Sequence, residues 1–177
     1  MRRISAVCLA LVLVAATSST LSAQQSIYML VDSIRGDQTA PHNREFKLSS
    51  FSSASSNPTT ISSATSGVAT GKTAFSPVKV SMRFHAPSSG AFNRSLALGT
   101  KLPSIEIRHY NAANAMFYKT VYENVFLTSV SSEGSDEAQQ QIEFVFMKVK
   151  WFASPDASGA TAPAQIGCWD LVMYRTC

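Results

Sequence analysis

The stretch that comes closest to a catalytic or ligand-binding motif is SGVATGKT, at residues 66–73. A phosphate-binding P-loop has the pattern G-x-x-x-x-G-K-[ST], whose backbone N–H groups and lysine hold the phosphates. Here Ser66 stands at the first glycine position. The residues that follow read as a strand, so no helix N-terminus would face a phosphate. We therefore interpret the stretch as the glycine-containing tip of a loop.

The three histidines, His42, His85 and His109, are isolated from one another in the sequence. They form no H-E-x-x-H pattern and have no cysteines at zinc-ligand spacing. No G-x-S-x-G elbow is present to expose a serine nucleophile. The acidic residues within 133–137 do not have the spacing of a calcium loop. These residue types predict a non-enzymatic protein with no catalytic, cofactor-binding or metal-binding residues.

The chain is organised around two long apolar runs, at residues 116–130 and 141–152, joined by a turn-rich segment. Their Val, Ile, Tyr and Phe residues favour strands, and the Ser, Gly and Asp between them favour a turn, which predicts a long antiparallel hairpin. The middle of both strands is apolar on both faces, so the second face needs a cover. That cover could be a helix, a second sheet or a neighbouring subunit. Alternatively, a bulge near Glu123 and Asn124 exchanges the faces partway along.

Shorter strands are predicted on either side of this hairpin, and one of them alternates almost perfectly. Within residues 76–85, Val78, Val80, Met82 and Phe84 share one face, which predicts a strand with one wet side. Short strands of this number, separated by turn signals, are typical of a barrel or a sandwich. The other predicted elements are strands at 27–32, 44–51, 104–109 and 168–175, and one helix at 88–98 that begins at Ser88 or Ser89 and ends at Gly99.

Residues 52–72 are rich in Ser, Thr and Ala and contain little to bury. A segment of this length is too long for an ordinary connection between strands. It predicts a projecting loop that is functional or mobile.

Residues 1–23 have the order of a secretory signal, with a basic end, an apolar core of about a dozen residues and a small residue at the cut. The core is shorter than the roughly 20 residues that a membrane-spanning helix needs. We expect cleavage after Ala23, with Ser22 as the alternative; a retained N-terminal anchor is the other interpretation. The mature chain, residues 24–177, would be one domain, secreted or periplasmic, without stable membrane insertion. If translation instead begins downstream of the apolar core, the chain would be cytoplasmic before export.

The formal net charge falls by two, from +4 to +2, when Arg2 and Arg3 leave with the signal. The remaining Lys and Arg residues are scattered and form no basic run. Because nucleic-acid binding needs a basic patch or stripe, we expect no nucleic-acid partner.

Two cysteines, Cys168 and Cys177, remain after cleavage. If the segment between them is an extended strand, nine steps of about 3.3 Å place them ~30 Å apart. A disulfide needs Cα atoms within roughly 7 Å. We therefore favour one packed thiol and one thiol in the tail over a bridge, while intermolecular pairing by Cys177 stays open.

The segment YMLVDSIRGDQT, at residues 28–39, resembles the opening of the Hcp family, the hemolysin-coregulated proteins of bacterial type VI secretion systems. Further similar segments follow in the same order, so the resemblance covers nearly the whole mature domain. These segments are HNREFKLSSF at 42–51, LALGTKLPSIEIRH at 96–109, YENVFLTSVSSEGSD at 122–136 and IEFVFMKVKW at 142–151.

The resemblance implies a mainly β fold, a compact β-barrel of two antiparallel sheets with one short α-helix at its side. It also implies a homo-hexameric ring that stacks into a tube and can carry small protein cargo. The projecting loop would contact the next ring, which makes Asn57, Thr59, Ile61 and Gly67 candidate stacking residues. Ring closure would bury the second apolar face of the long strands. The candidate subunit-interface residues on these strands are Tyr118, Tyr122, Phe144 and Phe146.

The predicted function is that of a non-enzymatic, ring-forming protein similar to the tube component or secreted effector of type VI systems. Members of the family normally lack a leader and are loaded from the cytoplasm, so the predicted signal distinguishes this chain. The alternative is a free-standing secreted or periplasmic β-barrel binding domain that kept the fold but not the tube role.

Overall fold

The computed structural model describes residues 25–62, 67–134, 138–156 and 158–177. The predicted signal, including its cleavage site at Ala23, therefore lies outside the described residues. Within the described part, no helix has the length and apolar character needed to cross a membrane.

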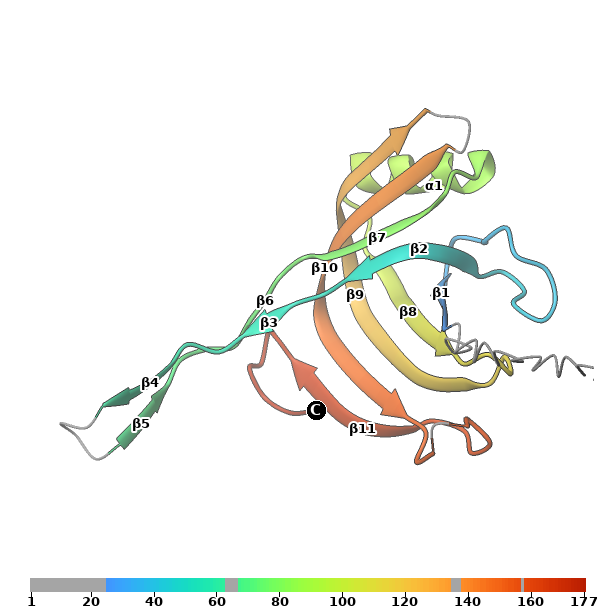
Figure 1. Ribbon diagram of the computed structural model, residues 1–177. Coiled ribbons are helices and arrows are strands. Elements are labelled where there is room, and N and C mark those ends of the chain that lie inside the picture. The colour runs from blue at the N-terminus through green and yellow to red at the C-terminus, as the bar shows by residue number, and fades with distance from the viewer. Residues whose placement is uncertain (1–24, 63–66, 135–137, 157) are drawn as a thin grey trace, which may run out of the picture.

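The described chain folds into one closed antiparallel barrel from which an arm projects (Figure 1). Its elements are β1 (Ser26–Val31), β2 (Phe46–Ser52), β3 (Ser55–Ser56), β4 (Thr59–Ser62), β5 (Gly67–Thr70), β6 (Ala74–Phe75), β7 (Val78–Arg83), α1 (Ala86–Ala97), β8 (Leu102–Tyr110), β9 (Met116–Glu133), β10 (Gln139–Ala153) and β11 (Ala164–Asp170). Among the described strands, six close the barrel in the order β10, β7, β2, β1, β8, β9 and back to β10. β11 pairs with the part of β10 that β7 leaves free. The predicted mainly β barrel with one short helix is confirmed.

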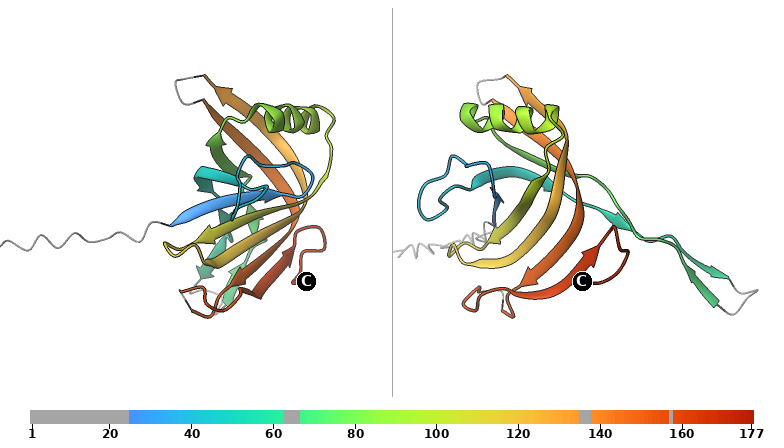
Figure 2. Two further views of the ribbon diagram at one scale, coloured as in Figure 1. Left: turned by 90° about the vertical axis from the view of Figure 1, so that its right-hand side faces the viewer. Right: turned by 180° about the vertical axis from the view of Figure 1, so that it is seen from behind.

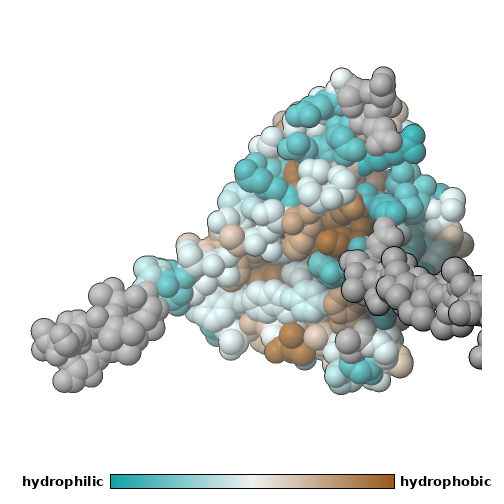
Figure 3. Space-filling view, viewed as in Figure 1, coloured by the Kyte–Doolittle hydropathy of each residue, from teal (hydrophilic) through white to brown (hydrophobic). Residues whose placement is uncertain are grey.

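The barrel interior is filled by alternate side chains of its strands. In β7, Val78, Val80 and Met82 are buried, whereas Lys79 and Arg83 are exposed, as the alternation predicts. Because successive side chains of a strand point to opposite faces, one sequence pattern supplies both core and surface. Figure 3 shows hydrophobic residues gathered near the middle of one face of the barrel, while the end that carries α1 is mainly hydrophilic.

The helix α1 lies across one end of the barrel (Figure 2). Phe92 is fully buried on its inner side, with its ring centroid 5.6 Å from that of Phe46 in β2. The helix begins after His85, earlier than the predicted serines, and the hydroxyl of Ser88 donates to the carbonyl oxygen of His85. It ends as predicted at Gly99, whose φ of 58° suits glycine at a helix C-terminus.

Both long strands exchange faces at one point along their length. Tyr122 and Val125 are buried in the same core although they lie three positions apart, a spacing that places side chains of a regular strand on opposite faces. Between them, Asn124 has a φ of 54°, a conformation that Asn tolerates better than most residues. Phe146 and Val149 show the same spacing on β10, and the register of the pair is unchanged across this point. The predicted exchange of faces near Asn124 is therefore present, but the predicted bulge is not: among the described pairs of β9 and β10, the register shifts only between Glu143 and Phe144.

The predicted projecting loop is an arm made of two short ribbons of paired strands (Figure 1). β3 pairs with β6 near the barrel, and β4 pairs with β5 farther out. Between the ribbons, the amide of Gly71 donates to the carbonyl oxygen of Pro58 over 2.8 Å. Main-chain pairing therefore continues from the barrel into the outer ribbon, and the arm is not an irregular loop.

The predictions of a strand over residues 168–175 and of unbridged thiols are wrong. β11 ends at Asp170, where the chain reverses and the amide of Asp170 donates to the carbonyl oxygen of Arg175 over 2.8 Å. The reversal brings the Cα atoms of Cys168 and Cys177 to 5.4 Å, and the two residues form a disulfide. The estimate for an extended strand failed because the carboxylate of Asp170 accepts hydrogen bonds from two amides within the turn and stabilises it.

The loop between β1 and β2 is held close to the start of β2. The amide of Gly36 donates to the carbonyl oxygen of Arg44 over 2.9 Å, and that of Gln38 donates to the carbonyl oxygen of Glu45 over 3.1 Å. Gly36 is buried, and an added Cβ would lie far inside contact distance of the Glu45 carbonyl oxygen. The close approach of two backbone segments therefore requires glycine at this position.

Gly36→Ala should lower the free energy of unfolding by about 2 kcal/mol or more, because the loop must move away from Glu45. Gly90→Ala is the matched control. Gly90 lies in α1 with open space around it, so alanine there should raise stability by about 0.5–1 kcal/mol. Urea unfolding followed by circular dichroism measures both variants. Equal stability of the two variants would contradict this account of the loop.

Candidate functional site

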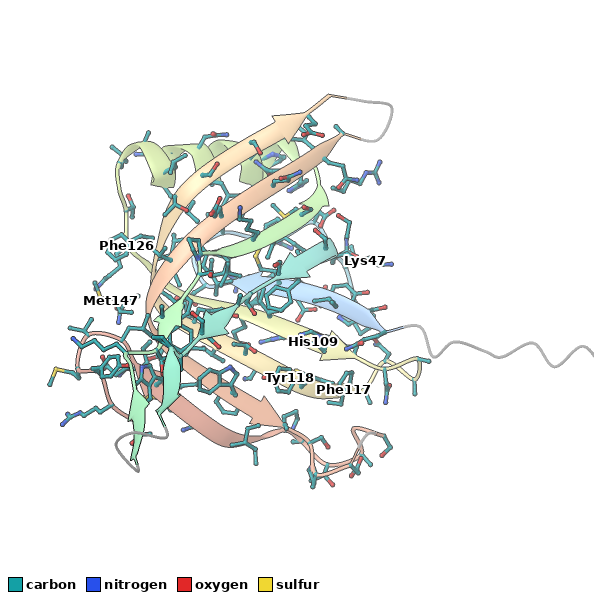
Figure 4. All side chains as sticks on the ribbon, turned by 60° about the vertical axis from the view of Figure 1, so that its left-hand side comes forward. Lys47, His109, Phe117, Tyr118, Phe126 and Met147 are labelled. Atoms are coloured by element: carbon teal, nitrogen blue, oxygen red, sulfur yellow. A yellow bond between two sulfur atoms is a disulfide. The ribbon has the colours of Figure 1, made fainter. Side chains whose placement is uncertain are left out.

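The long strands carry an apolar patch on the outer side of the barrel wall, formed by Phe126, Val145 and Met147, which we call the outer patch. Phe126 and Val145 pair directly across β9 and β10, and Met147 lies two residues farther along the same face. Val145 and Met147 are each 38% exposed. Figure 4 shows Phe126 and Met147 near one another at the same side of the barrel. Adjacent exposed apolar side chains on a sheet face indicate a contact surface.

The wall beside the outer patch carries charges that neutralise one another. Lys150 is ion-paired with Glu123 across β10 and β9, and Lys148 lies 3.6 Å from the carboxylate of Asp170. Further ion pairs lie on β8. Exposed pairs of this kind contribute only ~0–1 kcal/mol each to stability. Their consequence here is that Lys148 and Lys150, which follow Met147 on β10, are already paired.

Three of the four predicted subunit-interface residues lie in the core of their own chain. Tyr122, Phe144 and Phe146 are 3%, 0% and 8% exposed. The ring centroid of Tyr122 lies 5.4 Å from that of Phe144 and 4.7 Å from that of Phe146, and burial raises the pKa of Tyr122 to about 12. The prediction for these three is corrected, because the face exchange at Asn124 lets side chains from both faces reach one core. Tyr118 is partly exposed.

Sequence reasoning missed the outer patch because it took the face of β10 that carries Phe144 and Phe146 as the one that a neighbouring subunit covers. The alternation of Phe144 and Phe146 with Val145 and Met147 does separate two faces of β10. What the alternation alone leaves open is which of the two faces closes the core.

The four predicted stacking residues all belong to the arm. Asn57 is exposed near the inner ribbon, and its Nδ2 donates to Oγ1 of Thr73 over 3.2 Å. Thr59 and Ile61 belong to β4, and Gly67 belongs to β5, so backbone pairing brings them into one outer ribbon. The arm therefore holds the four residues together, away from the barrel wall.

A buried polar cluster around His42 has residue types that could do chemistry. The ring of His42 stacks on Tyr28 at 3.8 Å, with Nδ1 2.8 Å from Glu45 Oε2 and Nε2 2.7 Å from Asn114 Oδ1. Glu45 also accepts a hydrogen bond from Arg108 over 2.6 Å. Both ring nitrogens are engaged, so the cluster fixes the loop before β2 to the barrel wall and leaves no nitrogen for a substrate. Across the described ranges, no three His, Cys, Asp or Glu side chains are placed to hold a metal ion.

A second ring cluster surrounds His109 at the end of β8 and the start of β9. Its ring centroid lies 5.9 Å from that of Phe51, 6.2 Å from that of Phe117 and 5.5 Å from that of Tyr118. Figure 4 shows His109, Phe117 and Tyr118 gathered on one side of the barrel. Burial lowers the pKa of His109. Gln25 Nε2 lies 3.1 Å from His109 Nδ1, and an amide N–H can donate to that nitrogen only while it is unprotonated.

This lowered pKa predicts a pH-dependent contribution of His109 to stability. The folded-state pKa lies below the unfolded value of about 6.5, so the contribution is complete above that pH and is lost as the pH falls below it. The free energy of unfolding of the wild type should therefore drop more steeply between pH 7.5 and 5 than that of His109→Phe. Phe117→Leu, in the same cluster, should keep the wild-type slope. Urea titrations at several pH values would refute the account if His109→Phe and the wild type have the same slope.

Comparison with known proteins identifies the family. A sequence model of the family described as "Type VI secretion system effector, Hcp" matches residues 28–152. A search of curated proteins finds no match.

Solved structures share the fold. A structure described as a type six secretion system protein is 23% identical, with a TM-score of 0.77, over 87% of this chain and 100% of that chain. Hcp1 from Salmonella typhimurium is 15% identical, with a TM-score of 0.71, over 86% and 99% of the two chains. The secreted protein Hcp3 from Pseudomonas aeruginosa is 16% identical, with a TM-score of 0.57, over 86% and 99%. The match to the family runs from β1 to the end part of β10 and makes up well over half of the 177 residues, so the chain belongs to the Hcp family of type VI secretion proteins.

Proposed function

We propose that this protein is a non-enzymatic, ring-forming Hcp protein that acts as a tube component or secreted effector of type VI secretion. The family and the barrel fold support a role in a type VI secretion system. The outer patch and the arm supply two surfaces, one on the wall and one projecting from it, that a self-assembling protein needs. The proposed partner is therefore a second copy of the same chain.

The outer patch is the observation that carries the proposal. Phe126, Val145 and Met147 are apolar, and the nearby Lys148 and Lys150 are already paired, so a subunit that covers the patch would not have to desolvate these two as unpaired charges. In a closed ring each contact is heterologous, and the patch of one subunit meets a different surface of the next. Repetition of this contact closes the homo-hexameric ring. Tyr118, which is partly exposed, remains a candidate for a secondary contact.

The arm would connect one ring to the next. It extends away from the barrel, so its outer ribbon reaches a neighbour before the barrel wall does (Figure 1). The outer edges of β4 and β5 pair with no other described strand, which leaves main-chain groups ready for a partner. Contact through Asn57, Thr59, Ile61 and Gly67 would stack rings into a tube whose lumen can take small protein cargo.

The mature chain would act outside the cytoplasm. We propose that residues 1–23 direct export and are removed after Ala23. The disulfide between Cys168 and Cys177 supports a secreted or periplasmic location, because disulfides form and persist in oxidising compartments.

Val145→Asp should convert the ring to a monomer. A carboxylate buried without a partner in the contact should weaken each interface by at least about 3 kcal/mol. Size-exclusion chromatography with light scattering should give the mass of about six chains for the wild type and one for the variant. Leu98→Asp places the same charge at a 67% exposed apolar residue outside the outer patch and should keep the ring. A monomeric wild type at high concentration would contradict the proposed ring. An intact ring formed by Val145→Asp would show that the outer patch is not part of the contact between subunits.

Removal of the arm should abolish stacking but not ring formation. Residues 57–73 would be replaced by Asn-Gly, which suits a two-residue turn between β3 and β6. Electron microscopy should show stacked rings for the wild type and single rings for the deletion. Thermal unfolding serves as the control, since the closed barrel is untouched. Tubes formed by the deletion variant would exclude the arm as the stacking element.

A further inference from the structure

The chain ends in a short hairpin, residues 168–177, which we call the C-terminal hairpin. The carboxylate of Asp170 accepts hydrogen bonds from the amides of Val172 over 3.0 Å and Met173 over 2.8 Å. The amide of Arg175 donates back to the carbonyl oxygen of Asp170 over 3.2 Å. These bonds shape the turn, and the disulfide between Cys168 and Cys177 closes it.

Trp169 and Leu171 pack against the core, and the amide of Leu171 donates to the carbonyl oxygen of Met147 over 2.8 Å, but little burial holds the part of the hairpin beyond Leu171. Val172, Met173 and Tyr174 are 67%, 58% and 37% exposed, so their apolar surface contributes little to docking. Terminal segments are poorly ordered unless something ties them down. Here Cys168 is buried in β11, while Cys177 is exposed. The disulfide is therefore the main tether of residues 172–177, and a reductant can reach it through Cys177.

Tyr174 links the hairpin to the arm. Its hydroxyl oxygen accepts a hydrogen bond from the amide of Thr73, and Lys72 Nζ lies 5.4 Å from the centroid of its ring. The ring meets Trp169 edge-on at 5.3 Å. Tyr174 has a φ of 52°, a conformation that is unfavourable for a bulky residue and needs its surroundings to hold it.

Tyr174 contacts the arm at a point where it can restrain the outer ribbon. The barrel itself holds the base of the arm through Phe75, whose ring lies 5.8 Å from that of Phe146, and the two sides of this base are joined by a hydrogen bond from the amide of Ser76 to the carbonyl oxygen of Ala54. Tyr174 touches the arm farther out, at Thr73, shortly beyond which the outer ribbon begins. A support at that point restrains the swing of the ribbon more than contacts at the base do.

We propose that the Cys168–Cys177 disulfide sets the direction of the arm through Tyr174, so that the direction of the arm responds to redox conditions. A dithiol reductant would cleave the S–S bond, and the two sulfurs would take up two electrons and two protons while the dithiol becomes a disulfide. The C-terminal hairpin would then open, and Thr73 would lose its acceptor. The effect on the arm is independent of assembly; only its consequence for stacking rests on the proposed function.

Distances between spin labels on the full chain test the proposal. Labels attached through azide-bearing residues at Ser62 in β4 and at the exposed Lys101 avoid any added cysteine. Dilution with unlabelled chain isolates distances within one molecule. The oxidised protein should give one narrow distance distribution. Excess dithiol, Cys177→Ser and Tyr174→Phe should each broaden it at least about twofold; Tyr174→Phe keeps the disulfide and the ring but lacks the accepting oxygen.

Met173→Gln is the matched control, because it changes an exposed residue of the same turn, and it should keep the narrow distribution. If Cys177→Ser fails to fold by circular dichroism, Tyr174→Phe and the reduced wild type still decide the outcome. A narrow distribution in both of these would overturn the proposal. Light scattering on the same samples distinguishes the proposed ring from the proposed redox effect. A monomer whose distance distribution broadens on reduction would contradict only the ring. A ring whose distance distribution stays narrow on reduction would contradict only the redox effect.

Discussion

The fold depends on the pairing of β10 along both of its edges. β9 follows one edge, while β7 and then β11 take the other, so β10 both closes the barrel and attaches the C-terminal hairpin. Strands this long stay on a closed barrel only if they bend, and the β9–β10 pair has a register shift between Glu143 and Phe144 in addition to the positive φ of Asn124. Without the exchange, Tyr122 and Val125 would lie on opposite faces and one of them would meet water. The paired exchange of faces, at Asn124 in β9 and between Phe146 and Val149 in β10, therefore decides how two long apolar strands share one core.

Elements with one plain periodicity could be predicted from the sequence, because local pattern alone determines them. The alternation of β7 and the stop of α1 at Gly99 are of this kind. The face exchange is not, since Asn124 tolerates positive φ without requiring it, and its effect appears only when two strands pair. The disulfide escaped prediction because the distance estimate assumed a straight strand, whereas Asp170 reverses the chain. The polar cluster could not be predicted from the sequence, because His42 contacts Asn114, which lies 72 positions away in the chain.

The same face exchange explains why the candidate interface differs from the predicted one. Tyr122, Phe144 and Phe146 were predicted at the interface because they were assigned to the second apolar face of the long strands, which ring closure would bury. A barrel of this size needs those rings inside, where they pack on one another. What remains on the outer face is Phe126, Val145 and Met147, and Met147 is flexible enough to adapt to a neighbouring surface. A contact built on such residues is weak alone, so a closed ring, in which every subunit makes two contacts, is the arrangement that would make it persist.

The predicted leader would send the chain out of the cytoplasm, whereas the proposed tube role requires it to assemble with other copies. The C-terminal hairpin relates these two proposals, because its disulfide depends on the compartment. In a reducing cytoplasm the disulfide would not persist, and Tyr174 would not be held at Thr73. After export, oxidation would close the hairpin and direct the arm. Because export proceeds from the N-terminus, Cys177 would arrive after every strand of the barrel. On these proposals the wall of the ring forms first and the support of the stacking arm forms last, so premature stacking inside the cell is disfavoured by the chemistry of two cysteines.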